Sequence, residues 1–281
     1  MQGAPQGRLN GPRPPAGATP GAAERAGRLL AWLLTQRLEG YEKSFKMSPQ
    51  TLLHNRYLAG LPADRLPPAR LFEICRELGM PDVFLARLQS DLSGADTIHF
   101  GFEEGSHSGI FKIYLEYWKR WNDARIKGDE SILLHEAFKW DAQDGSKRTV
   151  ANYTCFPRLS RQQVMQRIAG IYNCDTAHAS YGFVKDLVRL AATRSNEQLM
   201  YLEVSEEGKP RASFDLNFHA AGLKLADIRH QVAKMFRHYA IPPAQLACLW
   251  GGVATKPLGH LSGGLSRDGQ DFLTLYYDPL G

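Results

Sequence analysis

Apolar and polar residues alternate along much of the second half of the chain, most clearly in the stretch SFDLNFH at residues 213–219. An extended strand turns successive side chains to opposite sides, so Phe214, Leu216 and Phe218 would share one face. Asp and Asn are poor strand formers, and a solvated face more often carries Thr, Lys or Glu. The opposite face therefore predicts side chains that look into a cavity: Ser213, Asp215, Asn217 and His219.

Similar alternation predicts four hairpins, each with a turn in which an acidic residue precedes Gly. They fall within residues 97–118, 132–157, 199–219 and 246–279. Their similar turns make them a structural quasi-repeat. In the last hairpin, the Gly-rich stretch GHLSGGLSR precedes a strand and not a helix. This order predicts a bulge or sharp bend there, because a phosphate-binding loop would need a helix N-terminus.

Helices are predicted where apolar residues recur at helical spacing. These segments fall within residues 23–41, 68–80, 81–94, 160–172, 181–194 and 222–242, with Ser160 available as a cap. Residues 1–23 are rich in Gly, Pro and Ala, which predicts a disordered leader. We therefore expect a single barrel domain over residues 24–281.

Antiparallel hairpins separated by amphipathic helices predict an α+β fold in which the sheet is closed. The helices would cover one face of the sheet, and an open sheet would leave the polar face in water beside long unpaired edges. Closing the hairpins into a barrel removes those edges and gives a polar lumen surrounded by an outer layer of helices. A water-facing open sheet is the alternative.

The polar strand faces supply the candidate site residues. They are Lys112, Tyr114, Glu116 and Trp118 in the first hairpin, His135 and Lys139 in the second, Tyr201 and Glu203 in the third, and Tyr276 in the last. Bulky Tyr and Trp side chains among them suit the wall of a pocket. No H-E-x-x-H, G-x-S-x-G or P-loop motif is present, so none of these standard catalytic classes is indicated.

Composition narrows the class of protein only a little. The chain has 281 residues, a formal net charge of +5 and four scattered cysteines without a C-x-x-C pair, which fits a reducing cytoplasm and argues against structural zinc. The basic face of the last helical segment lacks interleaved aromatics, so no nucleic-acid partner is expected. The longest apolar stretch, residues 29–34, is far too short to span a bilayer, and no membrane partner is expected.

The hairpin pattern resembles the ABBA-type aromatic prenyltransferases, and by length and local sequence the cyanobactin-type peptide prenyltransferases in particular. FKIYLEYW, residues 111–118, is similar to a Lys- and Tyr-bearing strand of that family, and the segments LMYLEVSEEGKPRASFDLNFH and LTLYYD follow in the family's order. The resemblance covers residues 97–281. It implies a PT-barrel that transfers an isoprenyl group from dimethylallyl or geranyl diphosphate to a peptide side chain or a small aromatic acceptor, with Mg²⁺ as cofactor.

The resemblance also implies roles for the candidate residues. Lys112 and Tyr276 match the family's diphosphate-binding positions, and Lys139, Tyr201 and Asn217 are assigned to the same role by strand face. Departing pyrophosphate requires fixed cations, and the allyl cation requires aromatic faces. The wall around the acceptor would include Tyr114, Trp118, His135 and His219.

One feature departs from the family. Its first hairpin, which carries a general-base Glu, has no visible counterpart before residue 97, where residues 40–95 read as Pro-rich and helical. Either the barrel is incomplete or those strands are disguised. The candidates for the base are Glu116, Glu203 and Asp215. A non-catalytic barrel that binds a peptide or apolar ligand is the alternative function, and the density of inward-facing cations distinguishes the two.

Overall fold

Ten antiparallel strands close into a barrel in the computed structural model, which describes residues 21–105, 108–128, 130–175 and 177–280. The strands follow each other in chain order from β1 to β11, and β11 pairs with β1 to close the sheet; the short β2 pairs only with β1. The strands are β1 (Gly40–Ser48), β2 (Thr51–Leu53), β3 (Arg56–Pro62), β4 (Thr97–Glu104), β5 (Gly109–Glu116), β6 (Ile132–Asp141), β7 (Arg148–Cys155), β8 (Tyr201–Glu206), β9 (Lys209–Asn217), β10 (Leu258–Leu265) and β11 (Asp271–Tyr277). The predicted closed α+β barrel is confirmed.

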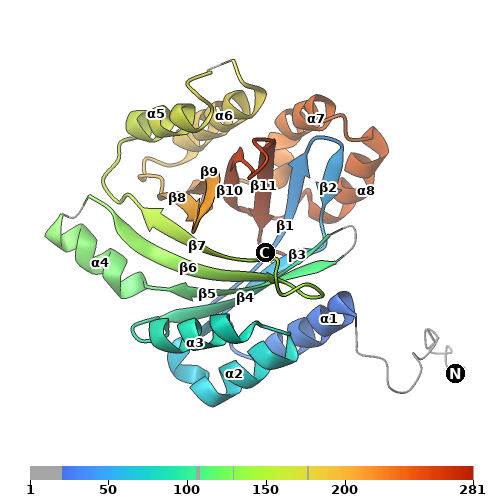
Figure 1. Ribbon diagram of the computed structural model, residues 1–281. Coiled ribbons are helices and arrows are strands. Elements are labelled where there is room, and N and C mark those ends of the chain that lie inside the picture. Colours follow the sequence, from blue (N-terminus) through green and yellow to red (C-terminus); the bar gives the residue numbers. More distant parts are fainter. Residues whose placement is uncertain (1–20, 106–107, 129, 176, 281) are drawn as a thin grey trace, which may run out of the picture.

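Helices surround the barrel on its outside (Figure 1). They are α1 (Ala22–Leu33), α2 (Pro68–Glu77), α3 (Asp82–Asp91), α4 (Trp118–Lys127), α5 (Arg161–Ile171), α6 (Ala179–Arg194), α7 (Arg229–His238) and α8 (Pro243–Val253), with single 3-10 turns η1 (Ala63–Arg65), η2 (His219–Ala221) and η3 (Leu225–Ile228). The predicted leader lies, up to residue 20, outside the described residues, and α1 begins at Ala22, inside the expected leader. Among the residues described, no helix is long and apolar enough to cross a membrane.

The outward strand faces form the hydrophobic core together with the helices. Phe214, Leu216 and Phe218 are fully buried in a cluster that includes residues of α5, α6 and α7. A second cluster joins β3 to β7 with α1, α2 and α3. Because the apolar face of SFDLNFH packs outward against helices, its polar face is directed into the barrel, as the alternation predicted.

Turn chemistry accounts for the hairpins. Gly208 and Gly269 have φ of 65° and 71°, the left-handed conformation that Gly adopts without steric cost. The predicted irregularity in GHLSGGLSR is also present, because the register between β10 and β11 shifts between Leu258 and Leu261. Gly264 has φ of 135°, and a Cβ there would lie 2.4 Å from the backbone oxygen of Ala212.

The expectation for residues 40–95 is wrong in its first third, where β1 and β3 form the missing first hairpin. In β1, Phe45 and Met47 face the core while Glu42, Ser44 and Lys46 line cavities on the inner face. The lysine at 43 interrupts the apolar face, and Ala, Gly and Pro in β3 are poor strand formers. Pairing with β4 and β11 therefore determines these strands more than their own sequence does.

Helix α4 also escaped prediction. The strand expected to continue through Trp118 ends at Glu116, and Trp118 is the first residue of α4. Its ring stacks on Trp121 at 4.5 Å between centroids, one turn along the helix. The predicted cap at Ser160 is confirmed, because Ser160 forms a full capping box with Gln163 at the start of α5.

Candidate active site

The barrel lumen contains two cavities that meet at its middle. One, of about 550 Å³, opens among the hairpin turns, and we call it the hairpin end. The other, of about 430 Å³, opens where the connecting helices begin, and we call it the helix end. Both cavities are lined by the same five residues at their junction: Arg56, Lys112, Tyr114, Tyr153 and Tyr276. Volumes of this size are typical of small-molecule sites.

The hairpin end concentrates basic side chains inside the barrel. Lys112 and Lys139 lie directly opposite each other on β5 and β6. Inward side chains of β1, β3 and β9 add Lys46, Arg56 and Arg211 to the lining. Such a group of buried cations is costly for a protein without a bound anion.

Two carboxylates offset part of this charge. Glu103 accepts a hydrogen bond from Lys112 at 2.6 Å and forms an ion pair with Arg56 at 3.1 Å. Glu206 is bound by Arg211 and Arg267, each at 2.6 Å. Among the described residues that line this end, the five inward-facing basic side chains therefore outnumber the carboxylates of Glu103 and Glu206, and the exposed Arg267 adds a further basic group.

Lys139 is an inward-facing lysine for which the described residues provide no carboxylate at ion-pair distance. Burial, together with the nearby Arg211 and Lys112, holds its pKa well below the usual value for lysine. Its closest hydrogen-bonding partner is the Tyr153 hydroxyl at 3.3 Å. Burial also lowers the pKa of Lys46 to about 8. A dianionic or trianionic ligand at this end would raise both values again.

Tyrosine rings separate the two ends. Tyr114 and Tyr153 lie 5.6 Å apart between ring centroids, and the Tyr276 ring lies 6.2 Å from His260. Burial raises the pKa of each of the three hydroxyls, so they are neutral donors at physiological pH. The tyrosines therefore give the middle of the lumen aromatic faces and neutral hydroxyl donors, next to the basic side chains of Arg56 and Lys112.

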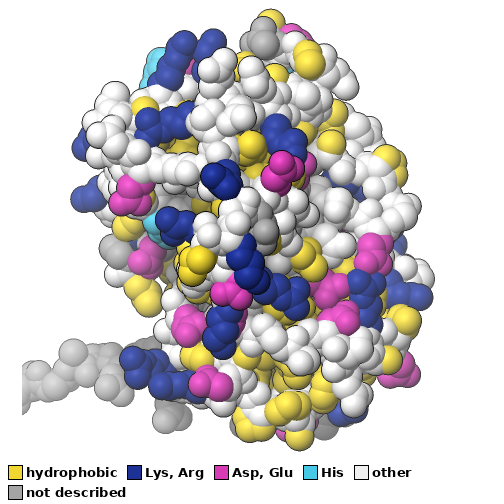
Figure 2. Space-filling view, turned by 90° about the vertical axis from the view of Figure 1, so that its left-hand side faces the viewer, with side chains coloured by type: hydrophobic (Ala, Val, Ile, Leu, Met, Phe, Trp, Pro, Cys, Tyr) yellow, Lys and Arg dark blue, Asp and Glu magenta, His cyan; other side chains and the backbone are white. Residues whose placement is uncertain are grey.

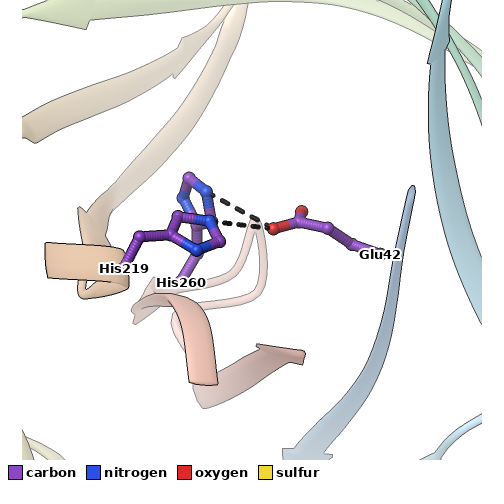
Figure 3. Close-up of side chains that lie close together, drawn as sticks. All are labelled: Glu42, His219 and His260. Atoms are coloured by element: carbon purple, nitrogen blue, oxygen red, sulfur yellow. Dashed lines mark ion pairs between the residues drawn. The ribbon is translucent and has the colours of Figure 1, made fainter. Parts of the chain in front are cut away.

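The helix end contains carboxylates and histidines. Glu116 contacts His99 at 2.9 Å and His135 at 4.0 Å. Across the cavity, His260 contacts Asp215 at 2.9 Å through Nδ1. Figure 3 shows the remaining cluster, in which Glu42 from β1 points toward His219 and His260.

Burial and charge act against each other in these pairs. For Glu116, burial favours the neutral acid, but the hydrogen bond with His99 and the nearby His99, His135 and His260 together outweigh burial and lower the pKa to about 2. For His260, the carboxylates of Glu42 and Asp215 overcome burial and raise the pKa to about 9. Burial lowers the pKa of His135 to about 4, so its imidazole is neutral at physiological pH.

The structure brings most of the predicted site residues into the lumen. Those that line a cavity are Lys112, Tyr114, Glu116, Trp118, His135, Lys139, Asp215, Asn217, His219 and Tyr276. Trp118 and His219 lie at the helix-end mouth, and the His219 side chain is half exposed. The positions of these ten residues on the inner face agree with the prediction.

The prediction for β8 is wrong. Leu202 pairs with Asp215, so Leu202 faces the lumen, whereas Tyr201 pairs with Leu216 and faces the helices. The Tyr201 hydroxyl donates to Glu203 at 2.9 Å, and Glu203 contacts Arg167 of α5. The polar atoms of this face thus find partners in the helix layer, and Tyr201 and Glu203 cannot reach a ligand in the lumen.

Sequence reasoning also missed residues that the lumen contains. They are Glu42, Lys46, Arg56, His99, Glu103, Tyr153, Arg211 and His260. Arg211 lies four residues before Asp215 on the same alternating strand, and this spacing could have identified it. Glu42, Lys46 and Arg56 lie in strands that were not predicted, so their inward direction could not be inferred.

Charge on the outer surface is mixed. Figure 2 shows Lys and Arg side chains interspersed with Asp and Glu over the face it presents. Mixed surface charge is ordinary for a globular protein. The inward-facing basic residues of the hairpin end are therefore the more informative part of the net charge of +5.

The fold is the ABBA or PT-barrel fold of aromatic prenyltransferases. Solved structures similar to this chain include 5-dimethylallyltryptophan synthase from Streptomyces coelicolor, with a TM-score of 0.57 and 13% identity over 85% of this chain and 81% of that one. AnaPT from Neosartorya fischeri matches with a TM-score of 0.55 and 13% identity over 85% and 78% of the two chains. The prenyltransferase PriB, solved with L-tryptophan and dimethylallyl thiolodiphosphate, matches with a TM-score of 0.56 and 13% identity over 85% and 79%. No protein-family model and no curated protein sequence matches this chain.

Proposed function

We propose that this protein transfers an isoprenyl group from an allylic diphosphate to an aromatic side chain or small aromatic acceptor inside the barrel. The observation that carries the proposal is the surplus of buried cations at the hairpin end, next to a belt of tyrosines. A non-catalytic barrel for an apolar or peptide ligand would not need this concentration of inward-facing basic side chains. The fold shared with known prenyltransferases gives independent support.

The diphosphate would bind at the hairpin end. Lys112 of β5 and Lys139 of β6 are paired on neighbouring strands, and Arg56 lines both cavities at their junction. Charge-assisted contacts of this type strengthen as the allylic C–O bond breaks and negative charge develops on the leaving pyrophosphate. Tyr276, also at the junction, would donate its hydroxyl to the same group.

Magnesium, which the family resemblance implies, does not fit the carboxylates at this end. Mg²⁺ requires oxygen ligands with octahedral geometry. Glu103 and Glu206, the carboxylates inside the described hairpin end, are each bound by two basic side chains. Lysine and arginine therefore supply the neutralising charge in this proposal, and no step depends on a protein-bound magnesium ion.

The allyl cation would form between the tyrosine rings. Tyr114 and Tyr153 offer neutral aromatic faces, which stabilise a cation and exclude water. An acceptor ring held at the helix end would then attack the cation through a ring carbon, forming a C–C bond. The resulting ring carries a proton that must leave to restore aromaticity.

Glu116 is the proposed proton acceptor. It lies on the same strand face as Tyr114, two residues further along β5, and is ionised because of its contact with His99. A protonated arenium ring is a strong acid, so a carboxylate with a low pKa still accepts its proton. Asp215 is then a positioning residue, since its carboxylate is bonded to His260.

A peptide acceptor is favoured by a groove outside the helix end. This groove of about 560 Å³ runs past α4 and the start of α5, where Trp121 and Arg161 line it. It shares Asn217, His219 and Met200 with the lumen cavity. A peptide could therefore insert an aromatic side chain into the barrel while its backbone lies in the groove, in agreement with the cyanobactin-type resemblance.

Mass spectrometry tests the proposal. The protein would be incubated with dimethylallyl or geranyl diphosphate and either free tryptophan or tyrosine, or short peptides containing these residues. We expect the acceptor mass to increase by one isoprene unit with dimethylallyl diphosphate and by two with geranyl diphosphate. The product yield should be larger for the peptides than for the free amino acids, and Glu116→Gln should form no product. Glu203→Gln is the matched control, because Glu203 faces α5 outside the lumen. Donor binding without any product in every acceptor pool would instead support the non-catalytic barrel.

A further inference from the structure

We propose that Glu42, His219 and His260 form a binding site for one divalent transition-metal ion, with zinc as the best match, at the helix end of the lumen. Figure 3 shows the three side chains converging from β1, from η2 and from β10. Two imidazoles and one carboxylate are a donor set that zinc uses in proteins. Its ligands are not among the proposed donor contacts, and the site lies at the end of the lumen where the acceptor would be held.

The distances match those between two ligands of one metal ion. The Nε2 atoms of His219 and His260 both lie 3.5 Å from Oε1 of Glu42. All three candidate ligand atoms lie within 4.8 Å of one another. Hydrogen bonds to these atoms would be about 2.9 Å long. Ligands at zinc distances of about 2.0–2.1 Å in a tetrahedron lie roughly 3.4 Å apart, close to the separations seen.

A second carboxylate orients one of the histidines. Asp215 contacts Nδ1 of His260 at 2.9 Å, which leaves Nε2 directed toward Glu42. Metal-binding histidines commonly donate the N–H of their other ring nitrogen to a carboxylate in this way, which fixes the orientation of the ring and its tautomer. The cluster thus contains both the ligands and the supporting group of a metal site.

The absence of a side chain at Gly259 leaves room for Glu42 and His219 to approach each other. A Cβ at Gly259 would lie 2.8 Å from Oε1 of Glu42 and 3.0 Å from Cε1 of His219. Any larger residue would therefore push the carboxylate and the imidazole out of their present positions. Gly259 lies next to His260 within the irregular part of β10, so the bulge and the cluster occupy the same place.

A second carboxylate–histidine group in the lumen fits a metal less well. His99 contacts Glu116 at 2.9 Å, a direct hydrogen bond that occupies the atoms a metal would need. His135 lies 4.0 Å from the same carboxylate. These two separations are unequal, and this group serves as the internal control.

Three protein ligands leave a fourth position open. Glu42, His219 and His260 all line the helix-end cavity, so this position faces the lumen. Zinc sites with three protein ligands and one open position are the reactive type, in contrast to closed structural sites. The half-exposed His219 lies at the mouth and gives an ion access from solvent.

Cobalt titration tests the site without donor or acceptor. The full chain, stripped with a chelator and dialysed, would be titrated with Co²⁺ while visible absorption is recorded. We expect the intense d–d bands of four-coordinate cobalt, saturation at one ion per chain, and loss of the bands on adding Zn²⁺. Absence of these bands, together with no bound Zn²⁺ by elemental analysis, would overturn the proposal.

Variants distinguish this cluster from its neighbour. His260→Ala and the surface-accessible His219→Ala should each weaken Co²⁺ binding at least 100-fold, and Asp215→Asn should weaken it about 10- to 100-fold. The control His135→Ala should bind one Co²⁺ with unchanged affinity. Equal loss in His135→Ala and His219→Ala would contradict the assignment. Because the readout is absorption, failure of prenyl transfer would leave this result unaffected.

Discussion

Replacing Lys139 by methionine should stabilise the unliganded protein while weakening its binding of an allylic diphosphate. Lys139 is buried beside Arg211 and Lys112 and hydrogen-bonds only to Tyr153, with no carboxylate of its own, among the contacts that the described residues make. Each pKa unit by which folding depresses a lysine corresponds to about 1.4 kcal/mol of lost stability. Its pKa lies well below the usual value, so Lys139→Met should gain at least about 1 kcal/mol.

The pH dependence of the free energy of unfolding tests the direction of this stability change. Lysine titrates near pH 10.4 in the unfolded chain and lower in the folded protein, so the folded state binds fewer protons between these values. Stability of the wild type should rise with pH across that range, and the advantage of Lys139→Met should shrink toward pH 10.4. Denaturant unfolding at several pH values measures both.

Donor affinity should change in the opposite direction. A charge-assisted hydrogen bond contributes about 1.5–3 kcal/mol, so Lys139→Met should bind dimethylallyl thiolodiphosphate roughly 10- to 150-fold more weakly. Titration calorimetry with this analogue and with inorganic pyrophosphate gives the affinity. Lys234→Met, on the exposed face of α7, is the matched control and should change neither quantity. A variant that is less stable and binds the analogue normally would refute the reasoning.

Three further predictions concern the same lumen. Lys112→Ala should leave the barrel folded, because Arg56 still binds Glu103. It should raise the barrier to transfer by on the order of 2–4 kcal/mol, measured as kcat/KM for the donor at saturating acceptor. Unchanged turnover would remove Lys112 from the site. Donor affinity should fall as pH rises above about 8, where Lys46 loses its proton in the free protein, and Lys46→Arg should move the fall to higher pH; an unchanged profile in that variant would contradict this origin. Tyr201→Phe should keep full transfer activity, because the Tyr201 hydroxyl lies outside the lumen, and a large loss in product yield would reverse our correction.

The sequence predicted the barrel because its strands alternate where one face meets helices and the other meets the lumen. SFDLNFH is the clearest case, since Phe214 and Leu216 are large apolar residues that mark the face packed in the core. The rule that polar side chains mark the lumen face failed for Tyr201, whose hydroxyl donates to Glu203 in the helix layer. Tyr can bury its ring in the core and still satisfy its polar tip, so its direction cannot be inferred from polarity alone.

The candidate site was only half visible for a related reason. Lys112 and Asp215 lie on strands with clear alternation, whereas Glu42 and Arg56 lie on strands with weak intrinsic propensity. These strands form because β4 and β11 offer partners on both sides, an effect of tertiary structure that a local pattern does not contain. The pairing of His260 with Asp215 likewise depends on register between β9 and β10.

A crystal structure of the protein with dimethylallyl thiolodiphosphate tests the central claim most directly. We predict density for the diphosphate at the hairpin end, within hydrogen-bond distance of Lys112, Lys139 and Arg56, with the dimethylallyl group between Tyr114 and Tyr153. A diphosphate bound outside the barrel, or a hairpin end that stays empty while the analogue saturates the protein in solution, would contradict the account.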